Sequence, residues 1–174
     1  AFHRARGVRR TIATTEGLAA RKDYDQLALT LTEAFDIDLI ALGGYMSIIT
    51  LPRCVNVHPA DLSILNENGK RRYTGDRAVY DAILAGETEL RSSTLWADQG
   101  VDTGPLLMVS APLPVELPEP LESLKMNKDR LMEIADEHQE RLKEIGDWKI
   151  FPRTIQLISE SRFAMDKNQR LYFE

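Results

Sequence analysis

Two polar side chains near the end of a short apolar segment are the first candidates for chemistry in this sequence. Asn56 and His58 lie within the segment Cys54–His58, which Pro59 ends. Side chains alternate along a strand, so Asn56 and His58 project to the same side. An amide can bind a developing oxyanion, and an imidazole can also move a proton near neutral pH. The pair is therefore suited to stabilise negative charge and to transfer a proton at one place.

A glycine-containing acidic loop offers the carboxylate that such a histidine would use. Residues 98–105 (DQGVDTGP) lie between two apolar segments and contain Asp98 and Asp102. A carboxylate at a strand end can pair with His58, raise the pKa of its imidazole, and fix which ring nitrogen faces the substrate. We expect Asp102 to be this group, with Asp98 as the alternative. On composition and spacing alone, a strand cap formed by Asn56 and His58 and a turn formed by Asp102 are the favoured explanation of these residues.

Strand-like apolar segments alternate with helical periodicity, which predicts an α/β fold with a mostly parallel sheet. The expected architecture is three-layered, with a twisted sheet between helices and with polar groups collected where strands end. We expect strands at residues 10–14, 38–42, 54–58, 92–97 and 106–109, helices at 23–35, 74–85, 128–145 and 151–159, and a C-terminal β-hairpin at 163–173.

Prolines, glycines and a capping residue suggest where these elements end. Four prolines in residues 112–120 predict an extended surface connection. Asn127 is expected to cap the long helix, Gly146 to end it, and Pro152 to lie in the first turn of the next helix. His138 lies on the apolar stripe of the long helix, so we expect it to be packed and hydrogen-bonded rather than catalytic.

The composition predicts a cytoplasmic globular domain, and the partners that we expect are small molecules. The 174 residues are 43% hydrophobic and carry a net charge of −5, which gives no reason to expect nucleic acid as a partner. No apolar run approaches the roughly 18 residues of a membrane span. Cys54 is the only cysteine, which predicts a buried thiol in a reducing compartment, and no Cys or His pair has the spacing of a metal site. The long helix fits either a monomer or a homo-oligomer.

Three linked motifs resemble those of the folate-dependent formyltransferases. The likeness is to the glycinamide ribonucleotide formyltransferase branch of that family, and it implies one domain over residues 1–174. The family's first strand and its glycine-rich phosphate turn would precede Ala1. The three motifs are residues 44–46 (GYM), 56–59 (NVHP) and 101–105 (VDTGP), and the wider likeness runs from residues 21–25 to residues 147–153 and the closing hairpin.

The resemblance implies that Asn56, His58 and Asp102 are the catalytic trio and that 10-formyltetrahydrofolate is the formyl donor. In the implied reaction an amine attacks the formyl carbon while the Asn56 amide and a protonated His58 hold the oxyanion, and Asp102 keeps the imidazolium charged. Arg21 would approach a carboxylate or phosphate, and Asp147 the ribonucleotide. The residues implied to line the pterin pocket are Tyr45, Met46, Ser47, Ile48 and Ile49, with residues 97–101, among them Ala97, Gly100 and Val101.

Some segments near the expected site depart from the family pattern and border the substrate. Residues 66–72 (NENGKRR) replace a proline-glycine-histidine loop, Ser47 replaces a common arginine, and Leu95 a frequent second histidine. Three functions therefore stay open. They are formyl transfer to glycinamide ribonucleotide, a folate-formyl enzyme that is a hydrolase or uses another amine, and a non-catalytic ligand-binding or assembly domain. The intact trio argues against the last.

Overall fold

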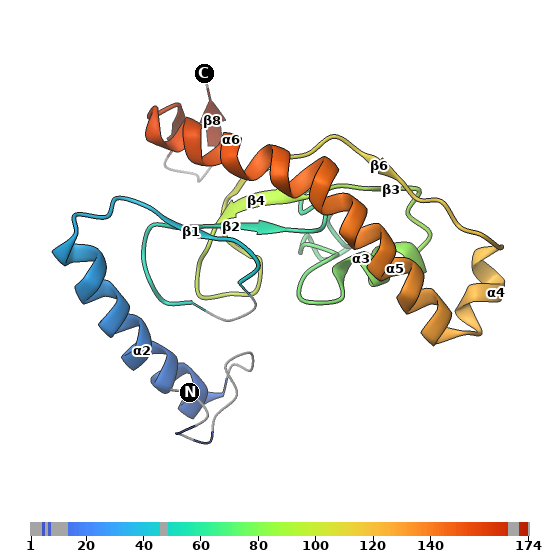
Figure 1. Ribbon diagram of the computed structural model, residues 1–174, viewed down its shortest axis with the longest axis horizontal. Coiled ribbons are helices and arrows are strands. Elements are labelled where there is room, and N and C mark those ends of the chain that lie inside the picture. The colour runs from blue at the N-terminus through green and yellow to red at the C-terminus, as the bar shows by residue number, and fades with distance from the viewer. Residues whose placement is uncertain (1–4, 6, 8–13, 46–48, 167–170, 174) are drawn as a thin grey trace.

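The central sheet carries the strand that holds Asn56 and His58. The computed structural model describes residues 5, 7, 14–45, 49–166 and 171–173. In it β2 pairs with β1 in parallel and with β4 in antiparallel orientation, and β4 pairs with β5 in antiparallel orientation. The order across the sheet is β1 (Ile40–Leu42), β2 (Cys54–His58), β4 (Ser93–Trp96) and β5 (Leu106–Val109) (Figure 1).

Helices and two short strand pairs surround this sheet. The helix α6 packs against β2, β4 and β5, and α3 packs against α5. Figure 1 shows α5 and α6 following one another as one long rod across the sheet. The helices are α2 (Thr15–Ala34), α3 (Ala78–Leu84), α4 (Leu121–Lys125), α5 (Lys128–Leu142), the π-helical turn η1 (Lys143–Asp147) and α6 (Trp148–Ser159), and the strand pairs are β3 (Glu89–Leu90) with β6 (Leu113–Pro114) and β7 (Phe163–Met165) with β8 (Leu171–Phe173).

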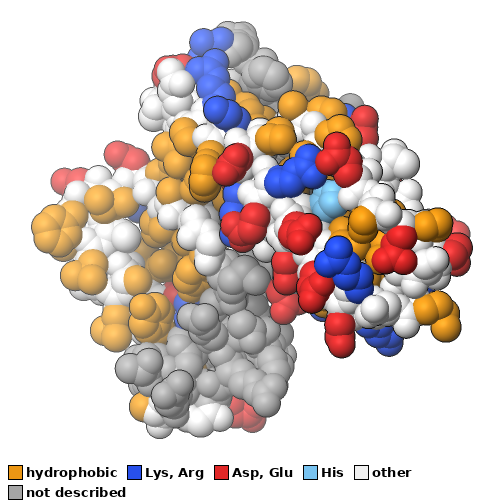
Figure 2. All heavy atoms as spheres, turned by 45° about the vertical axis from the view of Figure 1, so that its right-hand side comes forward, with side chains coloured by type: hydrophobic (Ala, Val, Ile, Leu, Met, Phe, Trp, Pro, Cys, Tyr) orange, Lys and Arg blue, Asp and Glu red, His pale blue; other side chains and the backbone are white. Residues whose placement is uncertain are grey.

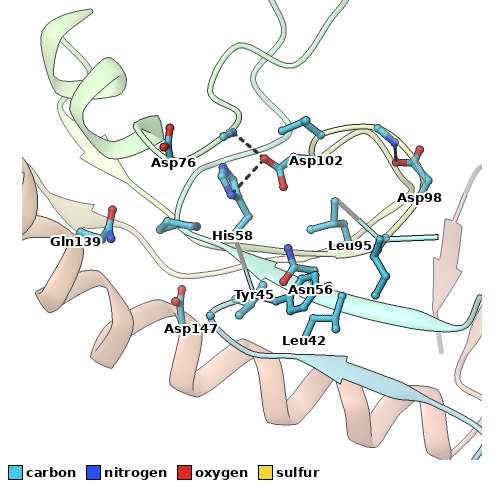
Figure 3. Close-up of a pocket in the computed structure, with 18 of the residues that line it drawn as sticks. Leu42, Tyr45, Asn56, His58, Asp76, Leu95, Asp98, Asp102, Gln139 and Asp147 are labelled. Atoms are coloured by element: carbon cyan, nitrogen blue, oxygen red, sulfur yellow. Dashed lines mark hydrogen bonds and ion pairs between the residues drawn. The ribbon is translucent and has the colours of Figure 1, made fainter. Parts of the chain in front are cut away.

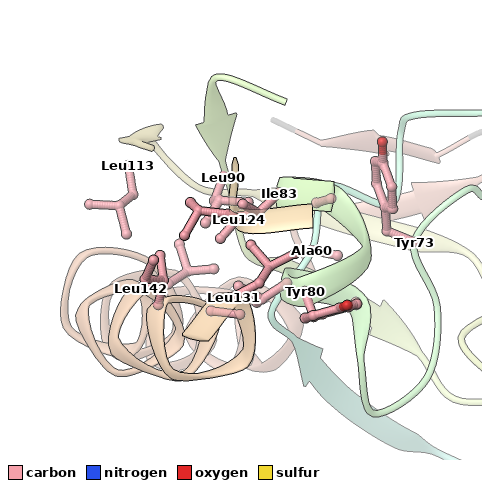
Figure 4. Packing of buried hydrophobic residues seen from close by; sticks show 14 residues of the cluster. Ala60, Tyr73, Tyr80, Ile83, Leu90, Leu113, Leu124, Leu131 and Leu142 are labelled. Atoms are coloured by element: carbon pink, nitrogen blue, oxygen red, sulfur yellow. The ribbon is translucent and has the colours of Figure 1, made fainter. Parts of the chain in front are cut away.

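The main hydrophobic core lies between α3 and the inner face of α5 (Figure 4). Leu131 and Leu142 of α5 are fully buried, and they pack with Ile83 of α3 and with Leu113 and Leu124 from the connection between them. Burying a side chain of this size stabilises a fold by about 1.5–3 kcal/mol. This cluster fixes α5, and with it the turn η1, at one end of the sheet.

The surface differs between the two ends of the molecule. Leu27 and Leu31 on α2 and its C-cap residue Phe35 expose 62%, 62% and 75% of their surface. Figure 2 shows hydrophobic side chains gathered on the left of the face shown, with acidic and basic side chains interspersed over its centre and right. Among the described residues, no helix combines the length and the apolar character needed to cross a bilayer.

The α/β class, the helix-flanked sheet and the C-terminal hairpin are confirmed, whereas the strand directions differ from those expected. We expected a mostly parallel sheet, but the described strands form a mixed one in which only β1 and β2 are parallel. Residues 97–105 join β4 to β5 without a helix. Parallel neighbours need a crossover connection of about a dozen residues or more, usually a helix. A connection as short as this one therefore makes β4 and β5 antiparallel.

Several boundaries also differ from the expected ones. The helix α2 begins at Thr15 rather than at residue 23, because the Thr14 side chain accepts a hydrogen bond of 3.0 Å from the Gly17 N–H and caps it. The expected strand at residues 10–14 lies mostly outside the described residues, and its last residue is this cap. Strand β1 begins at residue 40 rather than 38, and α3 begins at residue 78 rather than 74. The proline-rich connection contains β6, which pairs with β3.

Gly146 does not end the long helix as expected. Asn127 caps α5 as predicted, but the chain continues through η1 into α6, and the Trp148 N–H donates to the Lys143 carbonyl in a π-helical step. Pro152 consequently lies inside α6 rather than in its first turn. A Cβ on Gly146 would lie 2.3 Å from the Ser92 Oγ, so glycine serves close packing of the turn on the sheet.

We expect the substitution Gly146→Ala to destabilise the protein by about 1–3 kcal/mol, because overpacking a tight contact costs that much. Helix propensity alone would favour alanine by about 1 kcal/mol, so a net loss identifies the packing. Urea unfolding measures the difference. The matched control is Gly43→Ala, whose Cβ would lie 3.7 Å from the Phe151 ring and meet ordinary contact. Equal stabilities of the two variants would contradict this account.

Candidate active site

A cavity of about 430 Å³ opens where β1 and β2 end (Figure 3). Residues of β2, of the segment after β1, of the loop between β4 and β5, and of α5 and η1 line it. This is the edge at which the sequence analysis expected polar groups to collect. The lining includes Asn56, His58 and Asp102 together with Asp76, Asp98, Gln139, Lys143 and Asp147.

His58 and Asp102 face one another at this cavity. The His58 Nδ1 lies 3.5 Å from the Asp102 Oδ2, and the two side chains are 7% and 10% exposed. Asp102 Oδ2 also accepts a hydrogen bond of 2.8 Å from the Gly75 N–H. On the other side of the ring, His58 Nε2 lies 3.3 Å from the Tyr73 carbonyl oxygen. Donation from Nε2 to that carbonyl leaves Nδ1, beside the carboxylate, as the nitrogen that gains or loses a proton.

Asn56 completes the set with an unsatisfied polar atom. Its Oδ1 is buried and has no hydrogen-bond partner among the described residues. Buried polar atoms are nearly always hydrogen-bonded, and the exceptions gather at functional sites. The register of the sheet places Asn56 opposite Leu95 on β4 and beside Leu42 on β1, so its amide borders apolar walls of the cavity. A ligand that donates a hydrogen bond would satisfy this oxygen.

Asp98 has a different role from Asp102, which separates the two alternatives left by the sequence. Asp98 Oδ1 accepts hydrogen bonds from the Gly100 N–H at 2.9 Å and from the Thr103 hydroxyl at 2.7 Å. These bonds close the loop on itself. Asp98 lines the cavity, but the carboxylate that pairs with His58 is that of Asp102.

Burial controls the charge of the histidine. Desolvation lowers the pKa of His58 below its ordinary value of 6.5, although the charges of Asp102 and Asp147 and the bond to the Tyr73 carbonyl raise it. From the sequence we expected the carboxylate to raise the pKa of His58 and the ring to be protonated during the reaction. The ring is instead neutral near pH 7 in the free protein, because the loss of hydration outweighs the nearby negative charge.

A comparison with known families bears on this site. The family model described as "Formyl transferase" matches residues 3–132 of the chain. The chain belongs to the formyl transferase family. The matched segment includes Asn56, His58 and Asp102 and most of the cavity lining.

Three individual relatives of this formyl transferase share 30% sequence identity or less with it. The trifunctional purine biosynthetic protein adenosine-3 of Drosophila melanogaster is 30% identical over 112 residues, which are 60% of this chain and 8% of that protein. Glycinamide ribonucleotide transformylase 1 from Symbiobacterium toebii superposes with a TM-score of 0.61 at 23% identity, covering 88% of this chain and 64% of that one. A formyltetrahydrofolate deformylase from Pseudomonas syringae gives 0.58 at 15% identity, covering 90% and 45%. The chain spans less than two thirds of each protein, and both structural likenesses concern the fold.

The residues expected to hold the formyl donor fall on one wall of the cavity. Tyr45 and Ile49 lie on it after β1, and Ala97, Gly100 and Val101 lie on it between β4 and β5. A lining that includes Ile49, Ala97 and Val101, together with the unsatisfied Asn56 oxygen, suits a flat heteroaromatic ring. These residues of the formyl transferase therefore fit a folate donor. Met46, Ser47 and Ile48 lie outside the described residues.

Arg21 and Asp147, the two expected substrate contacts, lie in different surroundings. Arg21 is 5% exposed and does not line the cavity; its Nη1 lies 3.2 Å from the Asp25 Oδ1 and also contacts the Tyr45 hydroxyl. Asp25 in turn accepts hydrogen bonds from the Thr50 N–H and hydroxyl. Arg21 and Asp25 together therefore hold the segment after β1, which carries the cavity residues Tyr45 and Ile49 and which, with residues 97–101, is called the donor wall. Asp147 lies on η1 and lines the cavity. Burial raises the pKa of its carboxyl, against the lowering effects of Ser92, His58 and Lys143.

Three charged or amide side chains of the cavity lining, those of Asp76, Gln139 and Lys143, were not predicted from the sequence. Gln139 and Lys143 precede Asp147 at steps of four residues, which places all three along one side of the α5 and η1 rod. That spacing was a usable signal, and it was obscured by the expectation that Gly146 ends the helix. Asp76 follows the Gly75 turn, and no sequence pattern pointed to it. Among the described residues, no group of three or more His, Cys, Asp or Glu is placed to hold a metal ion.

The neutral state of His58 predicts how stability depends on pH. Because its folded pKa lies below 6.5, the unfolded chain binds more protons between these two values, and stability rises with pH across this window. We expect unfolding free energies to fall as pH decreases below about 6.5. The His58→Gln variant should lose this component, while NMR titration of the ring should report a pKa below the ordinary value. A ring that titrates above 6.5 would contradict the prediction.

Proposed function

We propose that this formyl transferase moves a formyl group from 10-formyltetrahydrofolate to the primary amine of glycinamide ribonucleotide. The observation that carries the proposal is the convergence of an amide, an imidazole and a carboxylate on one cavity. Asn56 and His58 come from β2, and Asp102 comes from a loop more than 40 residues later. A protein that only binds a ligand has little use for an oxyanion site beside a proton-transfer pair.

Each member of the trio has a role in this chemistry. The Asn56 amide donates a hydrogen bond through Nδ2 to the formyl oxygen as negative charge develops there, and its unsatisfied Oδ1 accepts one from the attacking amine. His58, neutral in the free protein, receives a proton at Nδ1. The Asp102 carboxylate, 3.5 Å away, stabilises the imidazolium that results. Bound 10-formyltetrahydrofolate would supply the formyl carbon, and as the bond from that carbon to N10 breaks, the proton held by His58 would pass to N10 of the leaving tetrahydrofolate.

The cavity has a second, polar side that suits an acceptor. Figure 3 shows Asp147 and Gln139 on the side of the cavity opposite Asp98 and the loop of the donor wall. Lys143, which lies between them on the same helical rod, also lines the cavity. These groups can hydrogen-bond the hydroxyls and the amine of a ribonucleotide while the folate occupies the apolar wall. This supports transfer to an amine over reaction with water.

Hydrolysis of the formyl donor is the second candidate function. The TM-scores to the transformylase and to the deformylase, 0.61 and 0.58, are nearly equal, so the fold favours neither. The same trio would then activate water in place of an amine. Transfer to another amine is the closely related third case, because Gln139, Lys143 and Asp147 do not by themselves select one acceptor.

The test is a steady-state assay of the full chain with 10-formyltetrahydrofolate, with and without glycinamide ribonucleotide. Formylation of the ribonucleotide supports the proposal. If the ribonucleotide is not formylated but another amine from a panel is, the acceptor is a different amine. Formate release without an acceptor identifies a hydrolase. Calorimetric titration with a folate analogue that shows no binding would favour a non-catalytic domain.

A further inference from the structure

One short segment contacts both members of the proton-transfer pair through its backbone. Residues 71–75 run past the cavity between the loop after β2 and the start of α3. The Tyr73 carbonyl faces the Nε2 of His58 at 3.3 Å, and the Gly75 N–H donates to the Asp102 carboxylate at 2.8 Å. The separation of these two side chains therefore depends on how this segment is held against the loop that carries Asp102.

Arg71 ties that segment to the loop. Its Nη1 donates to the Asp102 backbone carbonyl, and its Nη2 donates to the Gly104 carbonyl at 2.7 Å. A guanidinium is planar, so two parallel bonds fix the direction as well as the distance of the carbonyls that it binds. Arg71 is partly buried and is not among the cavity-lining residues. Any effect on the reaction must pass through the loop.

The loop needs such a restraint because its backbone is unusual. Asp102 adopts a left-handed conformation with φ of +52°, which is uncommon for a residue other than glycine. A Cβ at Gly104 would lie 1.8 Å from the Trp96 carbonyl oxygen, so the loop also passes very close to β4. Such conformations persist only where surrounding contacts hold them. The two Arg71 bonds hold the carbonyl of this left-handed residue and that of Gly104 two residues later.

We propose that Arg71 is a positioning residue, whose guanidinium clamps the Asp102 and Gly104 carbonyls and thereby holds the Asp102 carboxylate against His58. The assignment rests on the proposed function for its effect on catalysis. It also makes a prediction for the free protein, because the pairing of Asp102 with His58 exists without substrate. The charged groups that act on the His58 ring are Asp102 and Asp147, which raise its pKa, and Arg71, which lowers it.

The test uses Arg71→Lys, which keeps the positive charge but cannot form the paired planar bonds. We expect kcat to fall by up to about a hundredfold with KM for the formyl donor unchanged, because small misplacement of a catalytic group has that effect. The matched control is Arg77→Lys on the exposed start of α3, whose guanidinium lies over the Tyr80 ring. Full activity is expected in that control.

A double-mutant cycle shows whether Arg71 acts through Asp102. If it does, Arg71→Lys causes no further loss of kcat in a chain that already carries Asp102→Asn. Additive losses would overturn the proposal. NMR titration of His58 gives a readout that needs no activity: the ring pKa should fall in Arg71→Lys as the carboxylate moves away. An unchanged pKa would overturn the positioning role, whereas a lowered pKa in a protein without formyl transfer would sink only the proposed function.

A second variant keeps the proposal testable if Arg71→Lys does not fold. Arg71→Gln keeps one donor and should show the same loss of kcat, partly restored by added guanidinium ions at millimolar concentration. Loss of kcat without such rescue counts against the clamp. If neither variant folds, Arg71 is required for stability rather than for positioning, and the proposal is wrong.

Discussion

Replacing Asn56 by alanine is expected to lower kcat of formyl transfer by about a hundredfold to a thousandfold, as loss of one oxyanion donor does in other enzymes. The structure gives this amide no structural bond through Oδ1, which is buried without a partner among the described residues. Its removal should therefore leave the free energy of unfolding nearly unchanged. Steady-state kinetics and urea unfolding of the same preparation measure both quantities.

The pattern of the loss distinguishes catalysis from binding. If Asn56 acts on the charge that develops during reaction, kcat and kcat/KM fall together while KM for the folate donor stays constant. A rise in KM alone would show that the amide only binds the ground state, and the proposed role would be wrong. Asn68→Ala is a control, because Asn68 is exposed and, although residues 66–72 were expected to border the substrate, none of them lines the cavity.

The strand side of the site could be predicted from the sequence, whereas the loop side could not be fully resolved. Alternation along Cys54–His58 was sufficient to place Asn56 and His58 on one side, because a strand has a fixed two-residue period. A loop has no period. The choice between Asp98 and Asp102 depended on hydrogen bonds that close the loop, and on a left-handed residue that is invisible in the sequence.

The charge state of His58 also could not be predicted from the sequence. Proximity of a carboxylate suggested a raised pKa, but the net direction depends on how much water the ring loses, and that requires the three-dimensional packing around it. The same holds for Asp147. Its position on the cavity depends on a π-helical turn, and that turn depends on the close approach of Gly146 to Ser92.

The strand directions could have been predicted better than they were. The βαβ pattern led to a mostly parallel sheet, yet the connection between β4 and β5 has no room for a crossover helix. This error did not displace the site. Because β4 runs antiparallel to β2, with Trp96 opposite Val55, β4 ends beside the start of β2, and the loop after it folds back to line the cavity at the other end of β2.

Replacing Asp102 by asparagine should also reduce kcat by about a hundredfold or more, because the imidazolium of His58 loses the charge that stabilises it in the transition state. The side chains have nearly the same shape, so the bond from the Gly75 N–H can persist through the amide oxygen. Among the influences on the pKa of His58, the charge of Asp102 is the largest that raises it. The ring pKa should therefore fall further below 6.5 in this variant.

Asp98→Asn is the matched comparison, because it removes a carboxylate from the same loop and the same cavity. Its amide oxygen can still accept from the Gly100 N–H and the Thr103 hydroxyl, which are the bonds that close the loop. We therefore expect a smaller loss of kcat and little change in the His58 titration. A larger loss in Asp98→Asn than in Asp102→Asn would mean that the carboxylate facing His58 in the free protein is not the one that supports proton transfer, and the trio would have to be reassigned.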